Sequence, residues 1–91
     1  MTALETVREL HVLYGIAATN ELTETEPAIY SVYGKMIWAI HWAILAITAG
    51  DDPATEIRRL AGSLNHRANE SDDERVAALY GSWAQNIKSI T

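Results

Sequence analysis

His41 lies between two tryptophans, Trp38 and Trp42, and Lys35 precedes it by six residues in the same apolar run. A cationic side chain flanked by aromatic rings can bind a planar or anionic ligand through ring stacking and a charge-assisted hydrogen bond. In the structural interpretation, His41 instead hydrogen-bonds a carbonyl or a tyrosine, and Lys35 extends along apolar surface to reach water. The structural interpretation is the commoner outcome, so the cluster indicates a candidate site without naming its ligand.

Arg58 and Arg59 belong to the only basic cluster of an otherwise acidic chain. Guanidinium groups bind phosphate and carboxylate in a bidentate manner, so this cluster could hold an anion. The alternative is a solvated helix face paired with nearby carboxylates such as Glu56. If the chain binds a small anionic ligand, we expect a pocket between subunits that is lined by Tyr14, Lys35, Trp38, His41, Arg58 and Arg59.

No motif of an enzyme or of a metal centre stands out in the chain. It has no cysteine, and His66 and Glu70, four residues apart, supply only two possible metal ligands. There is no His-Glu-x-x-His pattern and no glycine-rich phosphate loop. We therefore expect no metal and no cofactor. A non-enzymatic role is favoured, and a helical active site assembled across a dimer is the remaining alternative.

Capping signals and apolar periodicity predict that these residues lie on helices. Thr2 and Glu5 have the spacing of a capping box, and the apolar residues after them recur at intervals of three and four. Gly50 is a typical helix stop, and Asp52 with Pro53 is a typical helix start. No segment shows the alternation of a strand. The sequence predicts one all-α domain over residues 1–91, a small four-helix domain with helices at about 3–19, 26–49, 53–67 and 72–90.

The predicted helix over residues 26–49 is apolar nearly all the way round, so something must cover each side of it. It is long enough to cross a membrane, but Lys35 and His41 lie within it, so we expect a central bundle helix and no membrane span. Because the other predicted helices are shorter, we expect part of it to form the interface of a homodimer. The expected interface residues are Tyr33, Met36, Trp38, Trp42, Leu45 and Trp83.

The composition limits the class of partner. The chain has 91 residues and a formal net charge of −5. Nucleic acids and anionic membranes attract clustered lysine and arginine, so we expect neither as a partner. Residues 1–10 contain Glu5 and Glu9 and no apolar core run, which is unlike a secretory signal. We therefore expect a cytoplasmic protein.

The run 35–47 resembles the final helix of small helical phage proteins that sequester cyclic nucleotide signals. The shared residues are Lys35, the pair Trp42-Ala43 and the pair Ala46-Ile47. The acidic residues that would follow the lysine in those proteins are absent, and the chain beyond this helix has no counterpart in them. The resemblance implies a nucleotide-like anion as a ligand.

Two functions follow from these observations. The first is a non-enzymatic helical interaction protein, an adaptor, inhibitor or regulator, that acts by stoichiometric binding of a protein partner as a homo-oligomer. The all-round apolar helix and the missing catalytic motifs favour it. The alternative is an oligomeric protein that binds or sequesters a small nucleotide-like anion in a pocket between subunits.

Overall fold

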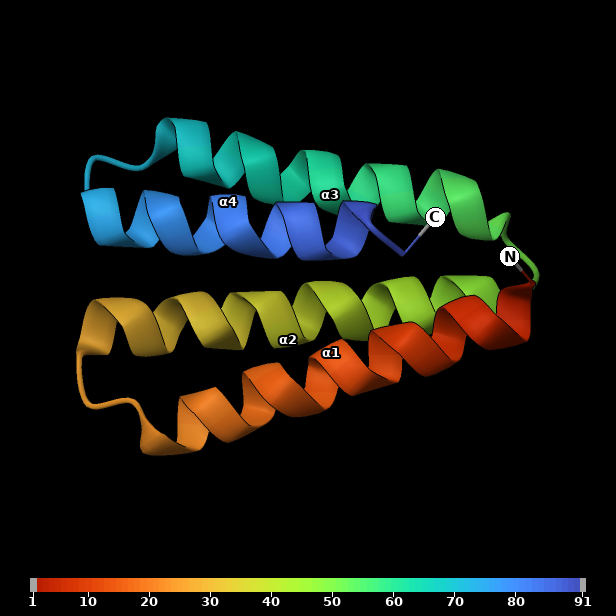
Figure 1. Cartoon of the computed structure of the whole chain (residues 1–91), viewed down its shortest axis with the longest axis horizontal. Helices are drawn as coiled ribbons and strands as arrows, with labels where there is room; N and C mark the ends of the chain where they lie inside the picture. The colour runs from red at the N-terminus through yellow and green to blue at the C-terminus, as the bar shows by residue number, and fades with distance from the viewer. Residues whose placement is uncertain (1, 91) are drawn as a thin grey trace.

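The chain folds into four helices over residues 2–90, the part that the computed structural model describes. No strand is present within those residues. Consecutive helices run antiparallel and are joined by short loops (Figure 1). The prediction of an all-α four-helix fold is therefore confirmed. The helices are α1 (Ala3–Thr23), α2 (Pro27–Thr48), α3 (Pro53–Glu70) and α4 (Glu74–Lys88).

Local capping explains where most of these helices begin. The Thr2 hydroxyl accepts a hydrogen bond from the Glu5 amide, and the Glu5 carboxylate accepts one from the Thr2 amide, so the predicted capping box forms. The Asp52 carboxylate caps α3 by accepting from the Thr55 amide at 3.0 Å. The Asp73 carboxylate caps α4, which therefore begins two residues later than predicted.

Two helices are longer than the sequence predicts, and two are shorter, since α2 spans Pro27–Thr48 instead of 26–49 and α4 spans Glu74–Lys88 instead of 72–90. α1 continues to Thr23 instead of ending near residue 19, and α3 continues to Glu70 instead of residue 67. α4 ends at Lys88. α1 has 21 residues and α2 has 22, so α2 exceeds its hairpin partner by one residue only. The excess length from which we predicted a dimer therefore remains against α3 and α4, which have 18 and 15 residues, and nearly disappears against α1.

The prediction of a helix that is apolar on every side is also wrong. α2 buries one face, which includes Val32, Met36 and Ile40, and its outward side mixes polar residues such as Ser31 and Lys35 with exposed apolar ones. Among the residues that the structure describes, no helix is long and apolar enough to cross a membrane. α2 is central in another sense, because it packs against all three other helices.

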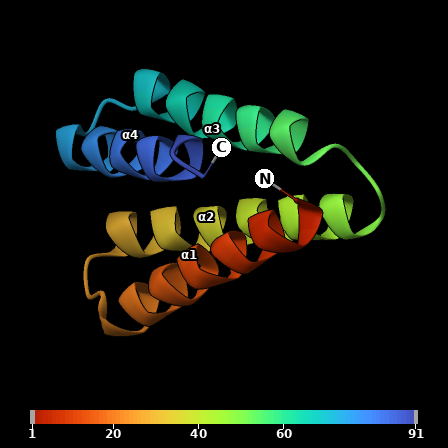
Figure 2. The same cartoon turned by 45° about the vertical axis from the view of Figure 1, so that its right-hand side comes forward.

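The helices form two layers, the α1–α2 hairpin and the α3–α4 hairpin (Figures 1 and 2). Apolar stripes at helical spacing bring the buried side chains of both layers into one core. Each hairpin is held mainly by contacts between its own two helices. The largest fully buried apolar side chains are Leu10, Met36, Ile40, Ile57, Leu64 and Ile87.

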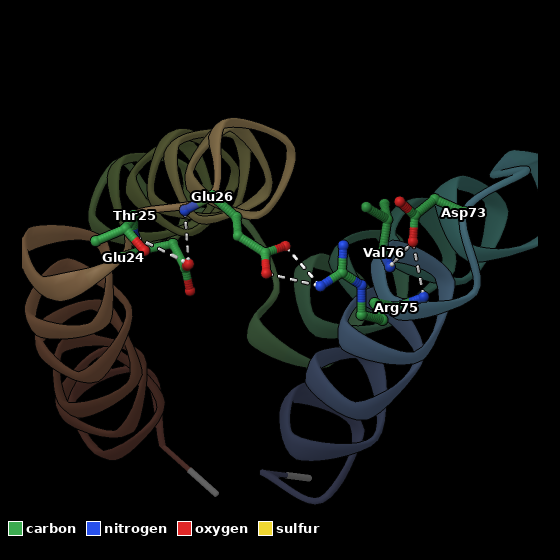
Figure 3. A network of polar contacts seen from close by, with 6 residues as sticks. All are labelled: Glu24, Thr25, Glu26, Asp73, Arg75 and Val76. Carbon is green, nitrogen blue, oxygen red and sulfur yellow. Dashed lines mark hydrogen bonds and ion pairs between the residues drawn. The ribbon is translucent and has the colours of Figure 1, made fainter.

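A polar contact links the two layers at the end that carries the α1–α2 and α3–α4 loops. Nη1 of Arg75 lies 2.8 Å and 2.6 Å from the two carboxylate oxygens of Glu26, so the start of α4 is tied to the start of α2 (Figure 3). The Glu24 carboxylate accepts from the amides of Thr25 and Glu26 and orders the same loop. Both side chains of the ion pair are exposed, so its contribution to stability is small.

Candidate interaction face

One face of α2 points away from the core and carries large apolar side chains. Six exposed residues follow one another along it at spacings of four and three, which is the heptad spacing of a helix–helix seam. Trp38 is 62% exposed and Trp42 is 63% exposed, and both lie near the middle of this row. We call the row the α2 seam. Its members are Ser31, Lys35, Trp38, Trp42, Leu45 and Ala49.

His41 packs against both tryptophans of the seam. Its ring meets the Trp38 ring edge-on, with centroids 5.9 Å apart, and the Trp42 ring with centroids 6.2 Å apart. Such edge-to-face contacts hold aromatic rings in place. The two indoles are therefore supported from within their own helix, which lowers the entropy that ordering them in a complex would cost.

A groove runs along one side of the seam, between α2 and α3. Small side chains from α2, Ala39, Ala43 and Ala46, leave room beside Trp42, and the groove volume is about 340 Å³. Its other wall comes from α3 and contains Glu56 and Arg59, Leu60 and Ser63. The groove is therefore apolar along α2 and carries charge along α3.

The charged groups of this groove form an ion pair, in which one side chain is buried and the other is exposed. The Glu56 side chain is buried, and its Oε1 accepts a hydrogen bond from Nη1 of Arg59 at 2.6 Å. The Arg59 side chain is mostly exposed. A carboxylate oxygen can accept more than one hydrogen bond, so Glu56 keeps acceptor capacity beyond Arg59.

Two further hollows lie on the other side of the seam, between α1 and α2. The first, of about 220 Å³, is lined by Tyr14, Ile37, Trp38 and His41. The second, of about 350 Å³, shares Tyr14 and His41 with it and reaches toward Leu45. The seam thus forms a ridge with a hollow on each flank.

The predicted ligand-binding residues do not form one site in a single copy of the chain. Tyr14, Trp38 and His41 come together in the α1–α2 hollow. Arg59 lies across the seam in the α2–α3 groove. Lys35 and Arg58 lie elsewhere: Lys35 lines a third hollow with Arg67 and Glu70, and the exposed Arg58 guanidinium donates to the Thr55 hydroxyl at 3.4 Å.

The predicted interface residues fall into two groups. Trp38, Trp42 and Leu45 are exposed on the seam, and Tyr33 is half-buried. Met36 and Trp83 are covered by the chain's own core, so neither is available to a partner in this conformation. Met36 and Trp38 are only two residues apart, and a helix places such residues on different faces.

The shifted pKa values mark helix starts and not a reactive centre. Hydrogen bonds from the Thr55 hydroxyl and amide hold the pKa of Asp52 below its usual 3.8. Hydrogen bonds from the Thr2 hydroxyl and amide likewise lower the pKa of Glu5. Within the described residues there is no group of three or more His, Asp or Glu side chains placed to hold a metal ion.

Sequence reasoning missed the α2–α3 groove and the buried Glu56. One signal was available, because Ala39, Ala43 and Ala46 repeat at intervals of four and three, next to the tryptophan row. Small residues at that spacing leave a furrow along a helix.

Comparisons with protein families, curated proteins and solved structures gave no match. The function therefore has to be inferred from the seam and its flanking hollows.

Proposed function

We propose that this chain is a non-enzymatic helical interaction protein that acts by stoichiometric binding of a protein through the α2 seam. The observation that carries the proposal is the pair of neighbouring tryptophans, Trp38 and Trp42, both more than 60% exposed and both in contact with His41. Tryptophan is among the residues that dominate binding energy in protein interfaces.

The size of the exposed apolar surface supports this proposal. At about 250 Å² per tryptophan side chain, the two exposed fractions leave roughly 300 Å² of indole in water. Leu45 and the flanking hollows enlarge this surface. Contiguous apolar patches of about 300–600 Å² on a small protein are often functional.

The heptad spacing of the seam favours a helical partner. A helix packed along the seam would place its own side chains between Trp38, Trp42 and Leu45, as ridges of one helix fit grooves of another. The role would be that of an adaptor, inhibitor or regulator in the cytoplasm. Self-association into a homodimer is part of the proposal, because a second copy brings a helix of this kind.

A test of the protein-binding role compares proteins retained by the wild-type chain and by the variant Trp38→Ser/Trp42→Ser in cells of the native host. We expect at least one protein to be retained in stoichiometric amount by the wild type and lost by the variant. Binding of that protein, once purified, should then be measured by calorimetry. Leu22→Ser is the matched control, because Leu22 is a large apolar residue that is 85% exposed on α1, outside the seam.

Two outcomes would contradict the proposal. One is that no protein, including another copy of the chain, binds the wild type and is lost from the double variant. The other is that Leu22→Ser loses the same protein, which would indicate general stickiness of exposed apolar residues and not recognition by the seam.

The second candidate function is binding of a small anionic ligand with a planar ring. It is favoured by the hollow in which Tyr14, Trp38 and His41 converge, where a ring could stack on aromatic side chains. A panel of nucleotides should then raise the melting temperature of the chain and quench its tryptophan fluorescence, and His41→Ala should abolish both effects. If no nucleotide shifts the melting temperature, this candidate is eliminated.

A further inference from the structure

We infer that the occupant of the α2 seam is a second copy of this chain, packed antiparallel, with Lys35 of each copy reaching the α2–α3 groove of the other at its Glu56 end. The inference rests on the proposed function in one respect, namely that the seam is a protein-binding face. It adds to the proposed homodimer the face on which the two copies meet, the direction of packing and a charged contact.

The first step is the symmetry of the seam about position 40. Trp38 and Trp42 lie two residues on either side of it, and Lys35 and Leu45 lie five residues on either side. In an antiparallel two-fold pair of helices, residues equally distant from the axis face each other across it. Trp38 would therefore pack on Trp42 of the second copy, and Leu45 on the aliphatic stem of its Lys35. A parallel pair would instead place Lys35 against Lys35, which is unfavourable.

The second step is the side of the seam on which Lys35 lies. It lines a hollow with Arg67 and Glu70 of α3, so it is on the α3 side of α2. A two-fold axis between antiparallel α2 helices brings the α3 helices of both copies to the same side of the contact. Lys35 of the second copy therefore arrives over the α2–α3 groove, at the level of Leu45.

The third step is charge complementarity at that level. Ala46 and Glu56 both line the α2–α3 groove. Because α2 and α3 are antiparallel and joined by a short loop, the last turn of α2 lies beside the first turn of α3. Lys35 makes no ion pair with residues 2–90 of its own copy, whereas the Glu56 carboxylate is buried and retains acceptor capacity. Glu56 is already paired with Arg59 at 2.6 Å, so the ammonium of the second copy would share the carboxylate with that guanidinium.

The fourth step is the area of the contact, which sets the expected affinity. From Ser31 to Ala49 the seam is about 27 Å long at 1.5 Å per residue, and a strip roughly two helix diameters wide covers on the order of 500 Å² per copy. The total of about 1,000 Å² is the size of a weak or transient interface, so we expect the dimer to dissociate on dilution. Such a dimer leaves the seam open to a foreign partner when the chain is dilute.

The absence of cysteine in the chain allows a direct test of partner and direction. In the antiparallel pair Ser31 faces Ala49 of the second copy, whereas the two Ser31 residues are about 27 Å apart along the helices. We expect Ser31→Cys/Ala49→Cys to form a covalent dimer on mild oxidation. Ser31→Cys alone should form no covalent dimer. Covalent dimers from Ser31→Cys alone would indicate parallel packing and overturn the inference.

Sedimentation of the wild-type chain from about 1 to about 500 μM tests the affinity independently. We expect a monomer–dimer equilibrium that Trp38→Ser/Trp42→Ser weakens at least tenfold and that Lys35→Glu weakens roughly tenfold. Leu22→Ser should leave it unchanged, and circular dichroism should show the same helix content in every variant. A wild-type chain that remains monomeric over this range, or a dimer that is insensitive to both seam variants, overturns the inference.

These results separate the inference from the proposed function. If the chain is monomeric but a foreign protein still binds the wild type and is lost from the tryptophan double variant, the protein-binding role of the seam holds and self-association is excluded. If neither a copy nor a foreign protein distinguishes the wild type from that variant, both fail.

Discussion

The two helical hairpins share one architecture but differ in their outer surfaces. Among residues 2–90, the exposed large hydrophobic side chains all lie on α1 and α2, with Trp38 and Trp42 the largest, and none lies on α3 or α4. The α3–α4 hairpin turns its apolar stripes, including Leu64, Trp83 and Ile87, into the core. The second hairpin is thus built to complete the core, whereas the first completes the core and also presents a surface for binding.

The largest expected difference between the hairpins is the loss of stability when a tryptophan in each is replaced by alanine. Trp83 on α4 is 5% exposed, so Trp83→Ala should lower the free energy of unfolding by about 3–5 kcal/mol through lost burial and the cavity left behind. Trp38→Ala, measured in dilute solution where association is absent, should change it by less than about 0.5 kcal/mol. Urea unfolding followed by circular dichroism measures both.

The outcome that would break this comparison is a similar loss for the two variants. If Trp83→Ala does not fold, Trp83→Phe should fold and still lose more stability than Trp38→Phe, because only the Trp83 site is tightly packed. Equal losses in the phenylalanine pair would show that the α2 seam is part of the core.

A glycine-to-alanine substitution should change the free energy of unfolding more in the loop between the hairpins than on the outer face of α3. Gly50 has a φ of +112°, which L residues rarely adopt, so Gly50→Ala should cost about 1–3 kcal/mol. Gly62 is exposed within α3, and a Cβ added there meets nothing within 4 Å, so Gly62→Ala should gain about 0.5–1 kcal/mol. Thermal unfolding should show the opposite signs. A loss in Gly62→Ala would mean that α3 is covered on that side.

Local signals in the sequence were sufficient for the scaffold. The capping box at Thr2 and the cap at Asp52 are short-range features, and both form as predicted. The end of α1 was predicted too early, because local sequence does not reveal that the last turn of α1 lies beside α2. Glu21 Oε2 is 3.2 Å from where a Cβ on Gly34 would stand, so the last turn of α1 lies close to α2.

The candidate site was harder to predict than the scaffold, because residue type does not determine which side of a helix is covered. Trp38 and Trp83 look alike in sequence, yet one is mostly exposed and the other is buried. The number of apolar residues in α2 predicted that other helices must pack against it. Which of its side chains they bury depends on where α1 and α3 cross it. Lys35 and Arg59, which we predicted to line one pocket between subunits, line separate hollows within a single copy.

A smaller effect is expected at the start of the α3–α4 hairpin when the pH is lowered. Because hydrogen bonds from Thr55 hold the folded-state pKa of Asp52 below its usual 3.8, the cap adds stability that is complete above the unfolded-state pKa. That stability is lost as the pH falls through the lower, folded-state pKa. Asp52→Ala should therefore melt below the wild type at about pH 7, and the gap should narrow toward about pH 2. Asp51→Ala is the matched control, and an unchanged gap in Asp52→Ala would contradict the cap's dependence on charge.

The smallest effect concerns the ion pair that links the hairpins, between Glu26 and Arg75. Both side chains are exposed, so solvent screens their attraction even though the charged atoms lie 2.6 Å apart. A double-mutant cycle with Glu26→Gln and Arg75→Gln should give a coupling that is favourable at low salt and vanishes at about 1 M salt. A pair within α3, Glu56 and Arg59, offers the contrast, because the Glu56 carboxylate is buried and its coupling should survive the same salt. If the Glu26–Arg75 coupling also survives at about 1 M salt, the two hairpins are held together by charge as well as by the shared core. The helix that carries the α2 seam would then be held more firmly against α4 than an exposed ion pair implies.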